Sequence, residues 1–560
     1  MARAQPEIRR VTGRKAFLEL LVSEGVTHLF GNPGTTELAI MEVVPDFPQL
    51  TYVLGLQESI VLGMADGYAR ASGRLTACNL HCTPGLGHAM GALYTAHMSG
   101  SPIIVTAGQY EIGHGLQEPL LYEDLVSIAR PLVKWAVEVT RIEDLPRIVR
   151  RAAKIAMAAP TGPVFISLPG SVLDQEAEID LGQVTRVIAS TRPDDGTLDA
   201  MAERLLAARA PLILAGREVA QDHAFAEVAE LGLLLGAPIA QEPVAHNVRF
   251  PSDHPLCIGD PGRSQEKLRA LFDQHDLLLS LGADILKLSA YSTVEPMPPT
   301  LELLHVSLRS WELGKNYPAE IAVQADVRET LRALLPRLGA RVTPEYAQQA
   351  ALRARAVRAN NWSVRRETLR AHIEPLASQQ PIDARVLMNI LSEVLPADVV
   401  LVEEALTSTP AFNALVALTE QRTYVGMASG GLGFCVPGAI GAALANPGRP
   451  VVAVLGDGSS LYAIQGLWTA AHFRLPITYV LANNQGYRII KERLLAMRHS
   501  RRFVGMDLSD PAPDFVAIAQ GFGVSAQRLT DPRELASALT QAIASRTPRL
   551  LDVVIDRGPL

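Results

Sequence analysis

The chain of 560 residues is long enough for three or four domains, and its 48% hydrophobic and 19% charged residues are typical of a folded α/β enzyme. Its formal net charge of −7, with both signs interspersed, argues against a nucleic-acid partner. No apolar run approaches the length of a membrane span, and the polar N-terminus lacks the apolar core of a signal peptide. The cysteines lack metal-ligand spacing, so we expect reduced thiols in a cytoplasmic protein: Cys78, Cys82, Cys257 and Cys435.

The first segment, residues 1–185, alternates helical patterns with short β-rich runs. The runs predicted to be strands are 28–30, 51–54, 76–80, 103–106 and 164–168. Such alternation is typical of βαβ units and predicts a parallel sheet. We therefore expect a doubly wound α/β domain in this segment.

The same alternation returns in two later segments. Residues 186–342 contain the strand-like runs 211–216 and 277–282, and residues 379–560 contain the runs 451–455 and 477–481. Between them, residues 343–378 include an Arg- and Ala-rich helical stretch without a strand signal, which we interpret as a linker. The sequence thus predicts an α/β protein with three doubly wound parallel-sheet domains.

Two stretches, one in the first segment and one in the third, have a similar sequence and the same predicted order of helix, loop and strand. Residues 91–97 lead through Pro102 into the run 103–105, and residues 466–472 lead through Pro476 into the run 477–480. One such echo can arise by chance, because these units share composition. The other interpretation is a pair of homologous domains flanking a third.

The most specific pattern joins two turns in the third segment. Gly456-Asp457-Gly458 follows one predicted strand, and Asn483-Asn484 follows another after 24 intervening residues. A carboxylate and an amide oxygen suit a hard cation such as Mg²⁺ or Ca²⁺. The glycines allow a phosphate to come close, and the helix that opens at Ser459 offers free N–H groups to a diphosphate. The pattern predicts a metal-diphosphate site, although a lone GDG turn is usually structural.

Two other stretches carry little weight alone. The glycine-rich run 430–434 precedes a helix of small residues, which is a common arrangement. Glu58 follows a predicted strand and opens a helix, where an acid is more often a favourable partner of the helix dipole than a catalytic group. Their meaning depends on the other motifs in the chain.

Together the motifs resemble those of the thiamin diphosphate-dependent 2-oxo acid decarboxylases and carboligases, and most of all the benzoylformate decarboxylases. The resemblance covers nearly the whole chain and is carried by residues 30–35, 56–58, 65–69, 79–81, 130–135, 249–255 and 430–434 and by the two turns. It implies a pyrimidine-binding, a central and a diphosphate-binding domain, in that order. It also implies thiamin diphosphate and Mg²⁺ as cofactors, with the thiamin diphosphate held between the subunits of a homodimer or homotetramer.

The resemblance assigns a role to individual residues. Glu58 would hydrogen-bond and activate the cofactor, His81 would handle protons, and Thr35 would contact the substrate carboxylate. The metal ligands would be Asp457, Asn484 and the carbonyl of Gly486. The cofactor would be bound by Asn32, Pro33, Glu58, Thr407, Ser408, Gly430, Leu432, Gly456, Asp457, Gly458, Ser459, Asn484, Gly486 and Tyr487. The substrate pocket would be lined by Thr35, His81, Leu120, Leu121, Ile490 and Arg493.

Two positions depart from the resembling enzymes. Ser289, a candidate catalytic residue, falls where they have a second active-site His, and a hydroxyl cannot carry protons near neutral pH as imidazole does. Arg493 falls where an aromatic pocket residue is expected. It belongs either to a solvated helix face or to a pocket in which it binds a second carboxylate of the substrate.

We therefore expect decarboxylation of a small-molecule 2-oxo acid to an aldehyde. The alternative, which Ser289 favours, is a carboligase or C–C lyase that makes or cleaves acyloins. A third hypothesis, a catalytically silent protein of this fold, is opposed by the intact Glu58, Asp457 and Asn484. Residues 190–340 show no persuasive FAD signature.

Overall fold

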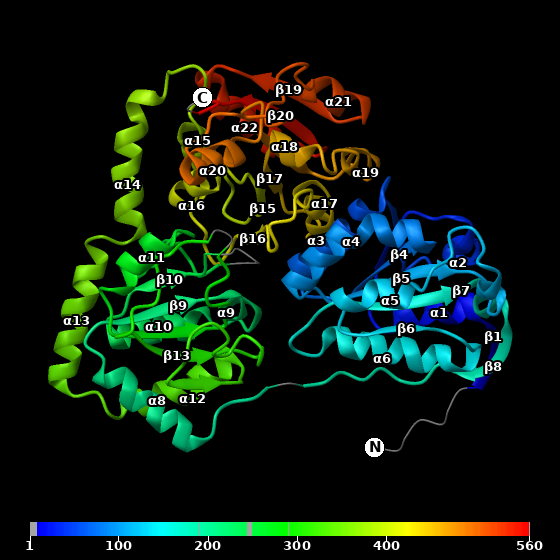
Figure 1. Ribbon diagram of the computed structural model, residues 1–560, viewed down its shortest axis with the longest axis horizontal. Helices are drawn as coiled ribbons and strands as arrows, with labels where there is room; N and C mark the ends of the chain where they lie inside the picture. The colour runs from blue at the N-terminus through cyan, green and yellow to red at the C-terminus, as the bar shows by residue number, and fades with distance from the viewer. Residues whose placement is uncertain (1–7, 189, 244–248, 289–290, 559–560) are drawn as a thin grey trace.

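Three α/β domains, each built on a six-stranded parallel sheet, make up the computed structural model (Figure 1), which describes residues 8–188, 190–243, 249–288 and 291–558. The N-terminal and C-terminal domains meet at the centre of the molecule, and the central domain lies below the C-terminal one in this view. The predicted fold class is confirmed, and every run predicted to be a strand is one. None of the described helices is long and apolar enough to cross a membrane.

The N-terminal sheet has the strand order β3-β2-β4-β5-β7-β6. Its inner strands are continuous apolar runs because helices cover both faces; all of β5 is buried. A separate antiparallel pair joins the two ends of the domain, β1 and β8. The elements are β1 (Ile8–Thr12), α1 (Gly13–Ser23), β2 (His28–Gly31), α2 (Leu38–Val43), β3 (Thr51–Leu54), α3 (Glu58–Ser72), β4 (Thr76–His81), α4 (Cys82–Ser99), β5 (Ile103–Gln109), α5 (Leu125–Ala129), β6 (Ala136–Glu138), α6 (Leu145–Met157), β7 (Val164–Pro169), α7 (Gly170–Asp174) and β8 (Glu176–Asp180).

The C-terminal sheet, with the order β16-β15-β17-β18-β20-β19, repeats the N-terminal topology strand for strand. The two echoing stretches occupy equivalent places, since α4 connects β4 to β5 and α19 connects β17 to β18. This favours the interpretation of the two domains as homologous. The elements are α15 (Ala384–Val394), β15 (Val400–Glu404), α16 (Thr409–Leu415), β16 (Thr423–Gly426), α17 (Cys435–Ala445), β17 (Val451–Gly456), α18 (Asp457–Ser460), α19 (Gly466–His472), β18 (Ile477–Asn483), α20 (Arg488–Arg498), α21 (Phe515–Gly521), β19 (Ser525–Leu529), α22 (Leu535–Ile543) and β20 (Arg549–Val554).

The central sheet has the order β11-β10-β9-β12-β13-β14, in which the strand order reverses beside β9, and two long helices, α13 and α14, lead from it to the C-terminal domain (Figure 1). The elements are α8 (Asp195–Ala207), β9 (Pro211–Ala215), α9 (Arg217–Gln221), α10 (Phe225–Leu235), β10 (Ile239–Gln241), β11 (Cys257–Gly259), α11 (Gln265–Phe272), β12 (Leu277–Leu281), β13 (Glu302–Val306), β14 (Ile321–Val323), α12 (Val327–Gly339), α13 (Pro344–Arg358) and α14 (Trp362–Ile373).

Helices α3 and α17 cross in close contact and join the N-terminal to the C-terminal domain. A Cβ atom on Gly67 would lie 2.2 Å from the carbonyl oxygen of Gly438, and one on Gly441 would lie 2.0 Å from that of Met64. Only glycine permits this approach, so the two helices pack backbone against backbone. Around the crossing, apolar residues of both domains form one continuous core.

A buried ion pair lies beside this crossing. Arg70 lies 3.6 Å from Asp66, donates a hydrogen bond to the carbonyl of Gly426, and stacks 4.7 Å from the ring centre of Phe434. The hydroxyl of Ser101 donates to Asp66. Because buried charges are tolerated only when paired and hydrogen-bonded, this group fixes how the domains meet.

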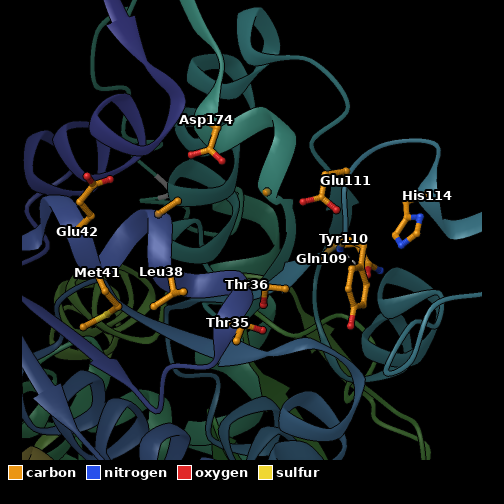
Figure 2. A pocket seen from close by; sticks show the side chains of 12 residues that line it. Thr35, Thr36, Leu38, Met41, Glu42, Gln109, Tyr110, Glu111, His114 and Asp174 are labelled. Atoms are coloured by element: carbon orange, nitrogen blue, oxygen red, sulfur yellow. Dashed lines mark hydrogen bonds between the residues drawn. The ribbon is translucent and has the colours of Figure 1, made fainter.

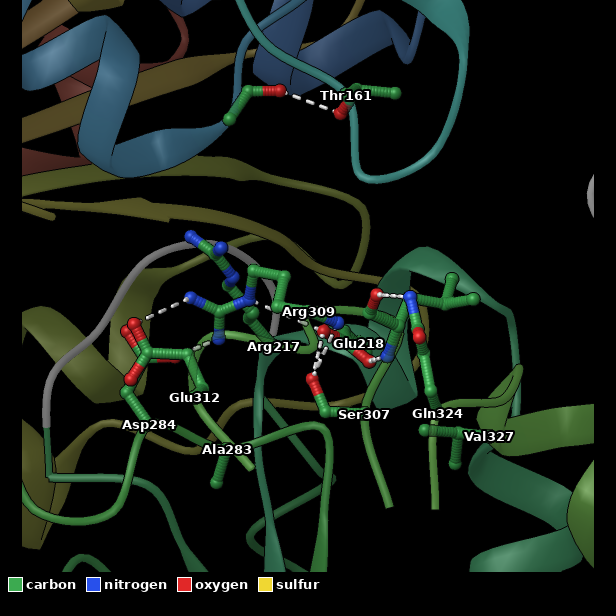
Figure 3. Close-up of polar contacts among 12 residues, drawn as sticks. Thr161, Arg217, Glu218, Ala283, Asp284, Ser307, Arg309, Glu312, Gln324 and Val327 are labelled. Atoms are coloured by element: carbon green, nitrogen blue, oxygen red, sulfur yellow. Dashed lines mark hydrogen bonds and ion pairs between the residues drawn. The ribbon is translucent and has the colours of Figure 1, made fainter. Parts of the chain in front are cut away.

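Charged side chains, joined by ion pairs and hydrogen bonds, lie at the carboxyl ends of the strands of the central domain (Figure 3). Glu218 accepts hydrogen bonds from Ser307 and from the backbone of Leu308, each at 2.8 Å, and pairs with Arg309 at 3.3 Å. Arg309 also pairs with Asp284, and Arg217 donates to the carbonyl of Met98 in α4 at 2.6 Å. Nucleotides bind at this end of many doubly wound sheets, but here paired side chains occupy it and tie the sheet to the N-terminal domain.

Candidate functional site

Thr35 lines an open cavity of about 850 Å³ at the carboxyl edge of the N-terminal sheet. Figure 2 shows Thr35 and Thr36 facing Gln109 and Tyr110, which end and follow β5. The cavity has the size of a small-molecule site, and its lining combines hydroxyls and apolar side chains with the carboxylates of Glu42, Glu111 and Asp174. The predicted substrate-contacting Thr35 is therefore accessible to a small ligand.

His81, the last residue of β4, is held by a buried carboxylate. Its Nδ1 atom lies 3.0 Å from Glu37 and 3.0 Å from the hydroxyl of Thr36. Glu37 also accepts the backbone N–H groups of Gly34 and Gly108, each at 2.9 Å. Burial raises the pKa of Glu37, while its hydrogen bonds and the neighbouring imidazole act in the opposite direction. The arrangement orients the ring and leaves Nε2 outside the hydrogen bonds of the described residues.

Sequence reasoning missed Glu37 as a site residue. The signal was an acid three residues after Gly34, a spacing at which the side chain can reach back to the backbone N–H at the start of the turn. Its contact with His81 spans 44 residues and could not be read from local spacing. Glu37 is therefore a positioning residue that only the fold brings to His81.

Glu58 opens α3 as predicted, and its side chain is 13% exposed. The side chain of Gln57 caps the helix by accepting the N–H groups of Ser59 at 2.6 Å and Ile60 at 3.3 Å. The carboxylate of Glu58 lies 3.1 Å from His88, which the sequence analysis did not identify, and 3.5 Å from the amide of Asn32. The structure thus brings together two of the predicted cofactor-binding residues, Asn32 and Glu58.

The two turns of the third segment meet at the carboxyl edge of the C-terminal sheet. The Oδ2 atom of Asp457 accepts the N–H of Gly486 at 3.0 Å, and burial raises the pKa of this carboxyl to about 6. The Oδ1 atom of Asn484 is buried and has no hydrogen-bond partner among the residues that the structure describes. An orphaned buried oxygen is costly in the absence of a ligand. A carboxylate and this amide oxygen fit a divalent cation that prefers oxygen ligands.

The remaining cofactor candidates of the C-terminal domain lie around these turns. Ser459 is buried in α18, directly after Gly456, Asp457 and Gly458. Thr407 and Ser408 line a cavity of about 410 Å³. Leu432, in the loop with Gly430, lines another of about 340 Å³ together with Ser59 and His88 of the N-terminal domain, whereas Tyr487 directly precedes α20.

The predicted substrate-pocket residues do not all meet. Arg493 of α20 lines a cavity of about 530 Å³ between the central domain, α14 and the C-terminal domain, while Ile490 is 47% exposed. Leu120 and Leu121 are exposed and are not among the residues lining the cavity beside Thr35. Their role in the pocket stays a prediction. Ser289 lies outside the described residues.

The candidate site is divided between two domains of the chain. Among the described residues, no hydrogen bond or ion pair joins Glu58, His81 or Thr35 to Asp457 or Asn484. The cavity beside Thr35 and the cavity beside Arg493 share no lining residue. One half therefore contains the predicted proton-carrying groups, and the other contains the two turns predicted to bind a cation and a diphosphate.

Comparison with known protein families matches all three domains of the chain. Residues 11–123 match the N-terminal TPP binding domain of thiamine pyrophosphate enzymes, residues 198–334 their central domain, and residues 407–553 their C-terminal TPP binding domain. The matched ranges contain the two halves of the divided site. The N-terminal range includes Thr35, Glu58 and His81, and the C-terminal one includes Asp457 and Asn484.

Individual relatives are similar over almost their whole length. The chain is 34% identical to benzoylformate decarboxylase of Pseudomonas aeruginosa, covering 97% of this chain and 98% of that protein. It is 28% identical to a probable acetolactate synthase large subunit of Methanocaldococcus jannaschii, covering 97% and 92%. Among solved structures, a 4-hydroxybenzoylformate decarboxylase of Rhodococcus jostii is 31% identical, with a TM-score of 0.85 over 98% of this chain and 99% of that one. Benzoylformate decarboxylase of Polynucleobacter necessarius is 29% identical, with a TM-score of 0.87 over 98% and 100%.

The metal-diphosphate interpretation of the two turns gives a test that needs no enzymatic assay. With inorganic diphosphate present, we expect Mg²⁺ to raise the thermal unfolding midpoint of the wild-type chain, because binding to the folded state stabilises it. Asn484→Ala removes the orphaned oxygen and should abolish the shift. Asn389→Ala, on α15 and outside both turns, is the matched control and should keep it. An equal shift in all three proteins would place the cation elsewhere.

Proposed function

The chain belongs to the family of thiamine pyrophosphate enzymes, and we propose that it is a thiamin diphosphate-dependent decarboxylase that converts a 2-oxo acid to an aldehyde. The observation that carries this proposal is that one chain contains both kinds of group. The C-terminal domain has a turn suited to a cation, with the orphaned oxygen of Asn484, and the N-terminal domain has Glu58 and the contact between His81 and the buried Glu37. The similarity to benzoylformate decarboxylases supports it.

The C-terminal residues would hold the cofactor. When bound, thiamin diphosphate supplies an electron sink for the electron pair left behind as carbon dioxide departs. Asp457, Asn484 and the carbonyl of Gly486 would bind Mg²⁺ or Ca²⁺, which neutralises diphosphate charge. The N–H groups at the start of α18 and the hydroxyl of Ser459 would bind the diphosphate oxygens. Glu58 would hydrogen-bond the pyrimidine ring.

Thr35 and His81 would act on the substrate. The hydroxyl of Thr35 faces the open cavity and can donate a hydrogen bond to the substrate carboxylate. Glu37 engages Nδ1 of His81, so Nε2 is the atom that would take and return the proton.

Carboligation is the second candidate function. The similarity to acetolactate synthases fits it, and Ser289 in place of an imidazole is the sequence feature that favours it. Both functions use the same cofactor turns and the same Glu58. Identification of the products therefore distinguishes an enzyme that releases an aldehyde from one that joins two carbonyl compounds.

We also propose that the working unit is a homodimer or homotetramer in which the N-terminal half-site of one chain faces the C-terminal half-site of another. The division of the site between two domains supports this. So do exposed apolar side chains of the N-terminal domain, of which Leu38 is 61%, Leu116 94% and Leu120 83% exposed. The cytoplasmic location stays a prediction.

A substrate panel tests the decarboxylase proposal. Supplied with thiamin diphosphate and Mg²⁺, the protein should release carbon dioxide and an aldehyde from at least one aliphatic, aromatic or dicarboxylic 2-oxo acid. The assay is repeated with an added acceptor aldehyde, and chiral acyloin exceeding free aldehyde would favour the carboligase. The absence of turnover across all three classes would refute both.

Glu37→Gln tests the positioning of His81. The amide does not hold Nδ1 of His81 as the carboxylate does, so the ring loses its fixed orientation and kcat should fall while KM changes little. We expect turnover to fall by about 10–100-fold. Glu19→Gln, on the outer face of α1, is the control. An unchanged kcat with an unchanged unfolding midpoint would contradict the role.

Co-expression of two inactive variants tests the site shared between chains. A hybrid of Glu58→Gln and Asp457→Asn chains has one site with both defects and one intact site. A random mixture of dimers should then recover about a quarter of wild-type activity. Pairing Glu58→Gln with His81→Ala, two defects of the same domain, restores no site and is the control. Failure of the first pair to recover activity would mean that each site lies within one chain.

A further inference from the structure

The cavity that Arg493 lines takes no part in the proposed reaction. It measures about 530 Å³ and lies between the central domain, α14 and the C-terminal domain. Its walls include the apolar side chains of Trp362, Leu406, Met427 and Ile489. This volume and lining are typical of a site that encloses a small organic molecule.

The cavity adjoins the proposed reaction centre through two short stretches of chain. Leu406 directly precedes Thr407. Ile489 lies in the first turn of α20, which begins two residues after the proposed metal ligand Gly486. The cavity also shares three lining residues with the cavity of Thr407 and Ser408, so it borders these proposed cofactor-binding residues.

Cations dominate the lining of the cavity. Arg263 and Lys267 come from the central domain, Arg365 from α14 and Arg493 from α20. All four side chains belong to exposed residues, so they surround the open side of the cavity. Convergence of cations from three parts of the fold creates a positive potential that attracts anions.

Neighbouring residues already engage two of the three acidic residues of the cavity. Asp260 lies 3.3 Å from Arg249 and accepts the amide of Asn413 at 3.0 Å. Glu403 accepts the hydroxyl of Thr409 at 2.6 Å and the N–H of Ala405 at 2.8 Å. Burial raises the pKa of the third acid, Glu404, to about 8, so it is largely neutral at pH 7.

Three of the cations have no carboxylate partner among the described residues. Arg263 donates only to the carbonyl of Pro243, at 3.3 Å, and Arg365 only to the carbonyl of Ile258. The side-chain amine of Lys267 makes no hydrogen bond or ion pair there. A backbone carbonyl carries no net charge, so these interactions do not neutralise the cations. The cavity retains positive charge that an anionic ligand could compensate.

We propose that this cavity receives the far end of the substrate, and that the substrate is an elongated 2-oxo acid with an apolar middle and a second carboxylate. The proposal rests on the decarboxylase function. The apolar walls contact the aliphatic or aromatic body, and Arg263, Lys267 and Arg365 bind the terminal carboxylate at the mouth. The guanidinium of Arg365 offers the planar fork that matches a carboxylate.

Two eight-carbon substrates of matched length test the charge requirement. With 2-oxosuberate, which has a terminal carboxylate, kcat/KM should exceed that with 2-oxooctanoate, which lacks it, by roughly tenfold or more. Lys267→Met and Arg365→Met keep most of the side-chain volume and should each reduce this ratio towards one, mainly through the KM for 2-oxosuberate. Arg209→Met, an exposed arginine of the central domain outside the cavity, is the control and should keep the ratio. A wild-type ratio of one, or an unchanged ratio in both cavity variants, would overturn the proposal.

A binding measurement decides the proposal even if the chain turns over neither substrate. Calorimetry with octanedioate and octanoate as unreactive probes should show tighter binding of the diacid to the wild-type protein loaded with thiamin diphosphate and Mg²⁺. The preference should fall in Lys267→Met and Arg365→Met and persist in Arg209→Met. Diacid preference without turnover would refute the decarboxylase function but keep the anion site. Turnover of other 2-oxo acids without diacid preference would do the reverse.

Discussion

The backbone-to-backbone crossing of α3 and α17 is the contact on which the site depends. Glu58 is the first residue of α3, and the loop with Gly430 and Leu432 leads into α17. Because glycines remove the side chains between the helices, their positions are fixed to within a backbone contact. This crossing places Leu432 beside the start of α3, where it shares a cavity with Ser59. It does not bring Glu58 to Asp457, so the chain contains two half-sites.

Charged side chains of the central domain lie at its contacts with both other domains, but they differ in how they are paired. At the carboxyl ends of its strands, Arg217, Glu218, Asp284 and Arg309 are paired and reach α4 of the N-terminal domain through the carbonyl of Met98. At its other contact, with α14 and the C-terminal domain, Arg263, Lys267 and Arg365 have no acidic partner within the described part of the chain. Buried ion pairs of the first kind hold domains in register, because breaking them strands a charge. Positive charge that is not neutralised can bind an anionic ligand. This favours substrates that carry a further negative charge.

Much of the fold was predictable from the sequence, because hydrophobic periodicity indicates the strands and helices and turn residues indicate where they end. The runs 103–106 and 477–481 are apolar, short and bounded by turn residues, and both are buried strands. Asp457 and Asn484 were predictable as neighbours because the carboxyl ends of parallel strands share one edge of a sheet, and β17 pairs with β18. Glu37 was not predictable, because its contact with His81 depends on how a 3₁₀ turn packs against a strand 44 residues away.

The sequence by itself determined the three α/β domains and the two turns at Asp457 and Asn484, since these depend on strand endings and on residue types at short spacing, whereas Glu58 and His81 were singled out only by the resemblance to a family. Tertiary structure alone decided that Glu37 orients His81, that α3 and α17 meet through glycines, and that Arg263, Lys267, Arg365 and Arg493 surround one cavity. The physical reason is that local sequence patterns reflect the hydrogen bonding of the backbone and the periodicity with which buried residues recur along a helix or strand. Charge compensation and close packing depend instead on residues far apart in the chain.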